Sequence, residues 1–436
     1  MAKTVGVVSL GCAKNRIDTE QMLGLLRAGG WEITADPSDA EVIIVNTCGF
    51  IDPAKQESID TILEMAEYKK TGHCRLLAAT GCLVQRYSEA LQEQMPEIDL
   101  LMGVSDYPHI CDLVERALNG ARPIACSTSR EVFEAPRVLT TAPFSAFIRM
   151  GDGCDNRCAY CAIPLIRGGY RSRPYDHVLN EARGLVEAGV KEITYIAQDT
   201  TRFGDDLPKG NLASILRDTA ALDGVHWVRT LYCYPSRVTD DLLDTLAGNE
   251  KICAYLDLPL QHIDGRLLKL MHRFGTPDDI RSVIRRTRER GITLRTTMIV
   301  GFPTETEDDF KRMLDFVEET RFDRLGAFTY SAEEGTPAAS MPDQVPEEVA
   351  QERLDRLMRL QQKISREINH ARIGKTYEVL LERQEDNGLW IGRSSEEAPE
   401  GDGCITLFTE QPHKAGEFVR ARITGADAYD LTGEIL

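Results

Sequence analysis

Three short apolar runs in the first hundred residues share one arrangement. They cover Thr4–Leu10, Val42–Asn46 and Leu76–Thr80, and each is followed by a loop and then by a segment of helical pattern. Uninterrupted apolar runs of this length are typical of strands that are buried on both faces, and repeated strand–helix units produce parallel sheets. Residues 1–135 are therefore predicted to form a doubly wound α/β domain.

Helix boundaries in this domain are marked by glycine and proline. Asp52 is expected to cap the second helix with Pro53 in its first turn, whereas Gly29 ends the first helix and Pro96 ends the third. The three loops that follow the strands are then expected at one edge of the sheet, because parallel strands all end on the same side.

A second domain is predicted for residues 136–372, after an irregular, proline-containing linker at 121–143. It contains six apolar runs separated by helical segments, which indicates a partial (β/α) barrel of the TIM type with its functional loops at the carboxyl ends of the strands. The runs are Phe144–Met150, Ile193–Ala197, Trp227–Cys233, Tyr255–Leu258, Leu294–Val300 and Leu325–Tyr330. Residues 346–372 lack glycine and have apolar residues at helical spacing, so one long connecting helix should follow.

The last segment, residues 373–436, has a different pattern. Five short β-like runs in about sixty residues predict a small antiparallel β-barrel of a kind that often binds nucleic acid. The runs are Tyr377–Leu381, Leu389–Gly392, Ile405–Phe408, Phe418–Ile423 and Tyr429–Leu436.

Charge and the absence of a targeting pattern narrow the possible partners. The chain has 51 Lys and Arg against 69 Asp and Glu, a formal net charge of −18, which opposes binding to a polyphosphate surface unless a basic patch is locally concentrated. Nucleic acid is therefore not expected as the primary substrate. Neither a signal peptide nor a membrane span is visible, so we expect a soluble cytoplasmic protein with no membrane partner.

Six of the twelve cysteines form two groups of three. One group has CxxxCxxC spacing, and each member of the other lies just after one of the three strands predicted in the first domain. The groups are Cys154, Cys158 and Cys161, and Cys12, Cys48 and Cys82. In a reducing compartment such cysteines point to metal ligation or catalysis rather than to disulfides.

Three thiolates can hold a cubic iron-sulphur cluster through three irons and leave the fourth iron open to another ligand. A structural zinc site is the weaker interpretation of the CxxxCxxC segment, because the nearest histidine, His177, lies beyond a predicted turn. The remaining cysteines are expected to be packing residues: Cys74, Cys111, Cys126, Cys233, Cys253 and Cys404.

The CxxxCxxC segment, with aromatic Tyr160 before its last cysteine, resembles the radical S-adenosylmethionine signature. The stretches SLGCAKNRIDTE, NTCGFI and GCLVQRY resemble the amino-terminal domain of methylthiotransferases, and the last segment resembles their TRAM domain, so the similarity covers the whole chain.

Within that family, IAQDTTRFG, LYCYPSRVTDDLL, YLDLPLQH and YDLTGEIL resemble the RimO branch, which modifies an aspartate of protein twelve of the small ribosomal subunit. The relatives that modify tRNA adenosine usually have serine-rich segments in place of CYPSR. Residues 372–436 contain seven Lys and Arg against thirteen Asp and Glu, or 7 − 13 = −6. An acidic barrel suits a basic ribosomal protein better than it suits tRNA.

The resemblance implies two 4Fe-4S clusters, each with three cysteine ligands. At the Cys154–Cys161 cluster, S-adenosylmethionine is expected to bind the open iron and, with an electron from a reducing donor, to give a 5′-deoxyadenosyl radical. The second cluster would hold sulphur for the β-carbon of the target aspartate, and a second S-adenosylmethionine would supply the methyl group. Tyr160 is expected near the adenine.

Further cofactor contacts are expected in the segment GFPTETEDDF, at Gly301, Thr304 and Glu305. The alternative is an ordinary strand-to-helix turn in which Thr304 caps a helix led by Glu305. Gln198 and Arg295 are candidates for contact with cofactor or substrate inside the barrel, or for structural hydrogen bonds.

Asp199, Arg167 and Arg171 are weaker candidates for guiding the substrate into the barrel. No spacing rule supports them.

Two other functions remain open from the residues. One is a tRNA adenosine methylthiotransferase with the same two clusters. The other is a non-enzymatic iron-sulphur electron carrier or redox sensor, whose clusters should be fully ligated by protein, so two three-cysteine groups argue against it.

Overall fold

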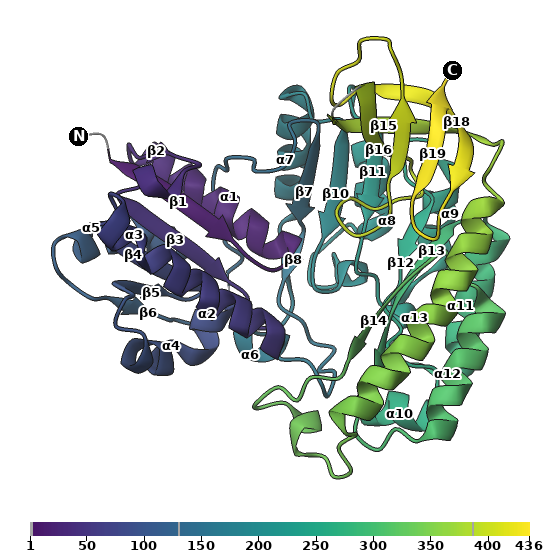
Figure 1. The fold of residues 1–436 in the computed structure, drawn as a ribbon, viewed down its shortest axis with the longest axis horizontal. Helices are drawn as coiled ribbons and strands as arrows, with labels where there is room; N and C mark the ends of the chain where they lie inside the picture. Colours follow the sequence, from purple (N-terminus) through teal and green to yellow (C-terminus); the bar gives the residue numbers. More distant parts are fainter. Residues whose placement is uncertain (1–2, 130, 386–387) are drawn as a thin grey trace. The chain divides into compact units, whose positions relative to one another are not determined.

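The computed structural model describes residues 3–129, 131–385 and 388–436 and divides into two compact units (Figure 1). Unit 1 comprises Met1–Thr140, Gly151–Arg173 and Ser331–Ala339. Unit 2 comprises Thr141–Met150, Pro174–Tyr330 and Ser340–Leu436. Both cysteine groups therefore lie in unit 1, although the sequence pattern assigns them to different domains.

Unit 1 is built on a six-stranded parallel sheet with the strand order β2-β1-β3-β4-β5-β6. The three strands predicted from the apolar runs are β1, β3 and β4. The strands are β1 (Thr4–Ser9), β2 (Glu32–Ile33), β3 (Val42–Thr47), β4 (Leu76–Gly81), β5 (Leu100–Met102) and β6 (Ile124–Ala125). The predicted linker at 121–143 thus contains a short edge strand, and its residue 130 lies outside the described residues.

Helices cover both faces of this sheet (Figure 1). They are α1 (Ala13–Ala28), α2 (Asp52–Ala66), α3 (Tyr68–Thr71), α4 (Cys82–Gln94) and α5 (Ile110–Leu118), with short 3-10 turns at η1 (Pro37–Asp39) and η2 (Tyr107–His109). Alternate side chains of β3 enter different cores: Val42 and Ile44 pack with α1 and α5, whereas Ile43 and Val45 pack with α2 and α4. The doubly wound prediction is confirmed, with the change of direction in strand order between β1 and β3.

The predicted helix ends are close to the observed ones. Gly29 is the C-cap of α1, and α4 ends two residues before Pro96. The predicted cap of α2 was wrong by one residue, because Ile51 is the N-cap and Asp52 is the first helical residue, with Pro53 in the first turn as expected.

Unit 2 contains all six predicted strands of the partial barrel. They form two parallel sheets, β7-β10-β11 and β12-β13-β14, joined by an isolated parallel bridge between Val228 and Ile252. The strands are β7 (Ser145–Arg149), β10 (Glu192–Ile196), β11 (Trp227–Thr230), β12 (Tyr255–Asp257), β13 (Thr293–Val300) and β14 (Arg324–Thr329).

The helices of unit 2 alternate with these strands, as a (β/α) pattern requires. They are α7 (Tyr175–Glu187), α8 (Leu212–Ala220), α9 (Asp240–Gly248), α10 (Gly265–Leu270), α11 (Pro277–Glu289), α12 (Glu307–Thr320) and the long helix α13 (Glu347–His370), with 3-10 turns η3 (Thr200–Arg202) and η4 (Pro235–Arg237). Helix α13 confirms the connecting helix predicted from residues 346–372.

The last five strands close into a small barrel, here called the terminal barrel, in the order β15-β16-β17-β19-β18. Four of the five pairings are antiparallel, and the β17–β19 pairing is parallel. The strands are β15 (Thr376–Gln384), β16 (Leu389–Arg393), β17 (Ile405–Phe408), β18 (Phe418–Ala426) and β19 (Leu431–Ile435).

The terminal barrel is attached to the amino ends of the central strands. Glu192, the first residue of β10, is fully buried and accepts two hydrogen bonds from Arg393, one of them 2.8 Å long. Tyr255, the first residue of β12, donates a 2.6 Å hydrogen bond to Asp402. The carboxyl ends of these strands therefore point away from the terminal barrel.

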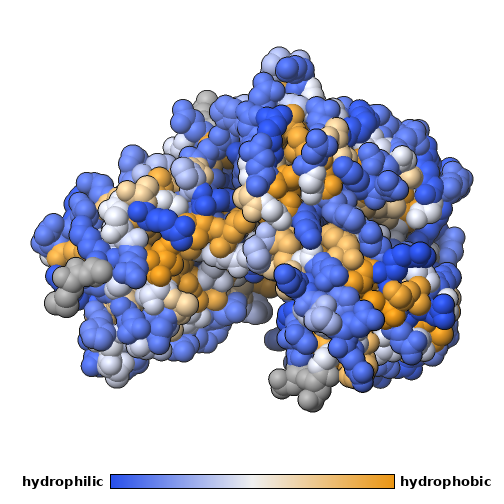
Figure 2. Space-filling view, turned by 90° about the horizontal axis from the view of Figure 1, so that it is seen from above, coloured by the Kyte–Doolittle hydropathy of each residue, from blue (hydrophilic) through white to orange (hydrophobic). Residues whose placement is uncertain are grey.

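The described residues include no candidate for a membrane-spanning helix. None of their helices combines the length and apolarity needed to cross a bilayer. On the face drawn in Figure 2, hydrophilic residues predominate and apolar residues lie between them.

Candidate active site

The first cysteine group follows three neighbouring strands. Cys12 is the N-cap of α1 just after β1, Cys48 comes directly after β3, and Cys82 begins α4 directly after β4. Because β1, β3 and β4 are adjacent and parallel, the three thiols extend from one edge of the sheet, next to its topological switch point.

Glycines allow these three loops to approach closely. Gly11 has φ +84°, and a Cβ atom at this position would lie 3.1 Å from the Sγ atom of Cys48. Gly81 has φ +99°, and its Cβ would lie 2.6 Å from the carbonyl oxygen of Thr47. A side chain at either glycine would push apart the loops that present the cysteines.

Asn15 connects the three loops. Its Nδ2 donates to the carbonyl oxygens of Leu10 at 3.2 Å and Thr47 at 3.0 Å, and its Oδ1 lies 3.5 Å from the Sγ of Cys82. Its own carbonyl accepts a 2.8 Å hydrogen bond from Asn46. Sequence reasoning missed this residue, because α1 carries many polar residues and nothing in the sequence distinguishes Asn15 from them.

Burial changes the acidity of two of these thiols. Burial raises the pKa of Cys48, and it raises the pKa of Cys82 to about 12 against the opposing influence of Arg167. Cys12 is exposed. Because the metal-binding form of cysteine is the thiolate, binding of a cluster must displace the protons of Cys48 and Cys82.

The second cysteine group lies in the loop between β8 (Gly151–Asp152) and α6 (Ile163–Arg167). The amide of Cys154 donates to the carbonyl of Gly168 at 3.1 Å, and the amide of Cys161 donates to the carbonyl of Cys158 at 3.0 Å. Cys158 is buried, whereas Cys154, Cys161 and Tyr160 are half-buried. β8 pairs with β9 (Arg171–Ser172), so the segment that contains this loop and α6 is closed by a pair of antiparallel strands.

Arg167, the last residue of α6, joins the segment of the second cysteine group to the first group. Its Nη2 lies 2.6 Å from Asp18, 3.0 Å from the Oδ1 of Asn15 and 3.8 Å from the Sγ of Cys82. The guanidinium is buried. The charge of Arg167 is thus paired inside unit 1, which argues against the suggested role in guiding substrate.

The other two residues considered for guiding the substrate, Arg171 and Asp199, also have local hydrogen bonds. Arg171 donates to the carbonyl oxygens of Arg167 and Gly169, at 3.1 and 2.8 Å. Asp199 is buried and caps η3 by accepting a 3.1 Å hydrogen bond from the amide of Thr201.

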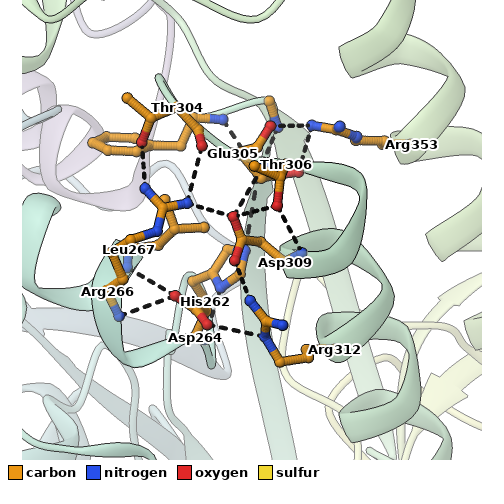
Figure 3. A network of polar contacts seen from close by, with 12 residues as sticks. His262, Asp264, Arg266, Leu267, Thr304, Glu305, Thr306, Asp309, Arg312 and Arg353 are labelled. Carbon is orange, nitrogen blue, oxygen red and sulfur yellow. Dashed lines mark hydrogen bonds and ion pairs between the residues drawn. The ribbon is translucent and has the colours of Figure 1, made fainter. Parts of the chain in front are cut away.

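Glu305 organises the turn that follows β13 (Figure 3). It is 4% exposed, and its Oε2 accepts hydrogen bonds from the amides of Gly301 at 2.9 Å and Phe302 at 3.3 Å. Arg353 of α13 donates to its Oε1 at 3.0 Å. Burial raises the pKa of Glu305 to about 7, although Arg353 and the two amides favour the carboxylate.

Thr304 occupies a left-handed conformation in the same turn, with φ +68°. Its Oγ1 accepts a 2.7 Å hydrogen bond from Arg266, and its amide donates to the carbonyl of Asp343 at 2.8 Å. The alternative in which Thr304 caps the next helix is wrong, because the N-cap of α12 is Thr306, in a capping box with Asp309 (Figure 3).

His262, at the end of the stretch YLDLPLQH, lies beside this turn. It is fully buried, and its Nε2 lies 3.9 Å from the Oε2 of Glu305 (Figure 3). Its Nδ1 accepts a 2.9 Å hydrogen bond from the amide of Asp264. Burial lowers the pKa of His262 to about 4, so the imidazole is neutral at pH 7. Sequence reasoning used this stretch only as a resemblance and missed the histidine.

Gln198 and Arg295 occupy different ends of the central strands. Gln198 is half-buried and follows the carboxyl end of β10. Arg295 lies near the amino end of β13, 3.9 Å from Asp257 and 3.8 Å from Asp402 of the terminal barrel. Arg295 and Gly301 are thus at opposite ends of one strand.

Three family models match the chain. The Uncharacterized protein family UPF0004 matches residues 4–103, the Radical SAM superfamily matches residues 148–317, and the TRAM domain matches residues 373–436.

A relative from Heliobacterium modesticaldum, the ribosomal protein uS12 methylthiotransferase RimO, is 49% identical over 437 residues, which cover 99% of the chain and 95% of the relative. The chain belongs to the RimO family. Two further RimO proteins, from Clostridioides difficile and Geobacter sulfurreducens, are 46% and 48% identical, and each match covers 99% of the chain and 98% of the relative.

Among solved structures, the radical S-adenosylmethionine methyltransferase TsrM from Kitasatospora setae, with cobalamin and a [4Fe-4S] cluster bound, has a TM-score of 0.55. Its identity is 15%, and the match covers 78% of this chain and 74% of that chain. This likeness concerns the fold alone.

Methylthiotransferases such as those of the RimO family use S-adenosylmethionine and two 4Fe-4S clusters. In the described part of the chain, no three His, Cys, Asp or Glu side chains converge closely enough to hold one metal ion. A cubic cluster binds each thiolate through a different iron and so needs ligands that are spread more widely. The residues present supply three thiols for each cluster: the first group on three loops that Asn15 ties together, and the second group on one loop.

Proposed function

We propose that this chain is a radical S-adenosylmethionine methylthiotransferase that adds a methylthio group to the β-carbon of an aspartate in ribosomal protein uS12. The observation that carries the proposal is the presence of two three-cysteine groups in one compact unit. The RimO relatives match over essentially the full length of both chains, which supports the same reaction and substrate. The β-hydrogen of aspartate is not acidic, so a radical route answers the chemical problem.

The two cysteine groups have separate roles in the proposal. Cys154, Cys158 and Cys161 hold the cluster at which S-adenosylmethionine, on accepting an electron, supplies the radical that removes the β-hydrogen. Cys12, Cys48 and Cys82 hold the cluster that provides sulphur. With three protein ligands each, both sites leave one iron open for a non-protein ligand.

The proposed contacts to S-adenosylmethionine are those that the family resemblance implies: Tyr160 in unit 1 and, separately, Gly301, Thr304 and Glu305 in unit 2. Gly301 and Phe302 have their amides fixed by Glu305, and Thr304 is held in a left-handed conformation, so the backbone of this turn is preorganised. Gln198 belongs to this group because it follows a strand's carboxyl end, where the ligands of such folds bind. Arg295, by contrast, is assigned to the contact with the terminal barrel.

Other parts of the proposal concern organisation and partners. The functional domains are taken as residues 1–135, 136–372 and 373–436, and the enzyme works in the cytoplasm, where its ribosomal substrate is made. A reducing protein or small molecule supplies electrons. The acidic terminal barrel favours a basic protein partner over nucleic acid as the primary substrate.

The proposal is tested by offering both candidate substrates to the reconstituted enzyme. The full chain is reconstituted with iron and sulphide without oxygen, then given reductant, sulphide and S-adenosylmethionine together with either uS12 or tRNA. Mass spectrometry should detect a methylthio increment on an aspartate of uS12 and none on tRNA. An increment on a tRNA adenosine instead would overturn the substrate assignment, and no increment on either would overturn the reaction.

A further inference from the structure

Arg167, in the short helix that follows the second cysteine group, contacts the first cysteine group. Its Nη2 reaches the Sγ of Cys82 at 3.8 Å and the Oδ1 of Asn15 at 3.0 Å. Asn15 in turn donates to the carbonyls of Leu10 and Thr47, in the loops that present the other two cysteines. The guanidinium thus acts on all three loops, directly on one and through Asn15 on two.

The surroundings of Arg167 are electrostatically mixed. Asp18 lies 2.6 Å from Nη2, and Asp152 lies 3.4 Å from Nη1. Cys82 also contacts the guanidinium. A buried arginine with two carboxylates is a satisfied ion-pair network. The simpler explanation is therefore that Arg167 only holds α6 against the sheet.

The contact between Arg167 and Cys82, a proposed cluster ligand, argues that Arg167 does more than hold α6 in place. A charge buried near a metal-bound sulphur acts in low dielectric, where its influence on the metal centre is large. Arg167 also belongs to the short helix that directly follows Cys161, so one residue ties the loop of one cluster to a ligand of the other.

We infer that Arg167 is a positioning residue that fixes Cys82 and raises the reduction potential of the cluster on Cys12, Cys48 and Cys82. The inference rests on the proposed function, because it requires a cluster at those cysteines. In the one-electron reduction of that cluster, the reductant is oxidised, the cluster gains one negative charge, and no bond forms or breaks. A nearby cation stabilises the reduced form more than the oxidised form, which raises the potential.

The experiment isolates this cluster in the full chain. Changing Cys154, Cys158 and Cys161 together to Ala removes the other cluster, and Arg167→Gln, Arg167→Lys and Asp18→Asn are each added to that background. The reduction potential is measured by stepwise titration with dithionite under electron paramagnetic resonance, and iron content is determined for every sample. Arg171→Gln is the matched control, because Arg171 lies four residues away and bonds only to backbone carbonyls and Asp152 in the contacts described.

The expected shifts differ in sign. Arg167→Gln should move the potential to more negative values, Arg167→Lys should move it less because the charge is kept, and Asp18→Asn should move it to more positive values. Arg171→Gln should leave it unchanged. Loss of an outer-shell partner of this kind typically lowers metal affinity by about 10- to 100-fold, so Arg167→Gln should also retain less iron.

The outcomes separate the inference from the proposed function. If the background chain binds no cluster, the proposed function itself fails. If the cluster is present and Arg167→Gln has the potential of the background, the inference is overturned and Arg167 is only a structural ion pair. Arg167→Gln could also bind no iron, and then the other two variants decide. If Arg167→Lys and Asp18→Asn both have the potential of the background, the inference is overturned.

Discussion

At the level of single residues, the chemistry depends on thiols whose protonation is controlled by burial. Cys82 is buried and has its pKa raised to about 12, and Cys48 is shifted in the same direction. Without metal these side chains are neutral thiols, and the hydrogen bonds of Asn15 hold their loops in place. The site is thus organised by the hydrogen bonds of Asn15 and by the Arg167–Asp18 ion pair before any cluster binds.

Removing single cysteines should separate the two half-reactions. Changing Cys154, Cys158 or Cys161 to Ala should abolish cleavage of S-adenosylmethionine, because the cluster that delivers the electron is lost. Changing Cys12, Cys48 or Cys82 to Ala should spare cleavage and stop transfer of sulphur. Chromatography of 5′-deoxyadenosine and mass spectrometry of uS12 measure the two activities. Methylthiolation that persists in any Cys12, Cys48 or Cys82 variant would contradict the two-cluster assignment. Cys111→Ala, outside both groups, serves as the control.

Glu305 should give the stability a defined pH dependence. Its pKa is about 7 in the folded state against an ordinary value of 4.5, so between these pH values the folded state binds more protons than the unfolded state. Stability contributed at this site therefore falls as pH rises from about 4.5 to 7 and is constant above. The difference in free energy of unfolding between wild type and Glu305→Gln, from urea titrations, should fall over that window. A difference independent of pH would contradict the assignment, and Glu318→Gln, at an exposed position of α12, is the control.

At the level of elements, the turn after β13 is fixed against α13. Gly301 has φ +74°, and a Cβ added there would lie 2.5 Å from the Cβ of Ala350 on α13. Arg353, one turn further along α13, donates to Glu305. The glycine therefore meets both a conformational and a packing requirement, and the helix supports the turn from behind.

Gly301→Ala should lower the free energy of unfolding by about 1–3 kcal/mol, because it combines a left-handed backbone with a steric overlap. Adding Ala350→Gly should recover part of the loss by removing the overlapping atom. Urea denaturation followed by circular dichroism measures both effects. Gly184→Ala in α7, where a Cβ meets open space, is the control and should be neutral or stabilising by up to about 1 kcal/mol. Equal effects at Gly301 and Gly184 would show that the contact with α13 is unimportant.

At the level of the whole molecule, buried ion pairs hold the terminal barrel on the central strands. Burial raises the pKa of Glu192, but Arg393 and Arg229 outweigh it and lower the pKa to about 2. Glu397 behaves in the same way with Arg372 and Arg324, and its pKa is also about 2. Because both carboxylates link the terminal barrel to neighbouring elements, this barrel is a fixed part of unit 2.

Arg393→Met should destabilise the protein by about 3–5 kcal/mol at pH 7, because it leaves the buried carboxylate of Glu192 without its main partner. The folded pKa lies below the ordinary value of 4.5, so the stabilisation is present above pH 4.5 and is lost as pH falls towards 2. The difference between wild type and variant in urea unfolding should shrink over that range. Arg420→Met, at an exposed position of β18, should change stability by less than about 0.5 kcal/mol. A small effect of Arg393→Met at pH 7 would show that the Arg393–Glu192 ion pair does not hold the terminal barrel in place.

Hydrophobic periodicity predicted most strands of this fold but missed the two- and three-residue strands β2, β5, β6, β8 and β9. The runs at Val42–Asn46 and Leu294–Val300 became β3 and β13 with shifts of one residue, because uninterrupted apolar runs have few alternatives to a buried strand. The cap of α12 was missed for a local reason: Thr304 and Thr306 have equal capping chemistry, and only the left-handed turn at Thr304 decides between them.

The sequence by itself determined the main strands of each domain, the two cysteine groups and the family, because periodicity and motif spacing are local properties of the chain. Only the tertiary structure decided that Arg167 reaches Cys82, that Glu305 meets Arg353 and that Arg295 lies on the side of the terminal barrel. Those contacts join residues far apart in sequence, and long polar side chains have many possible partners until packing selects one.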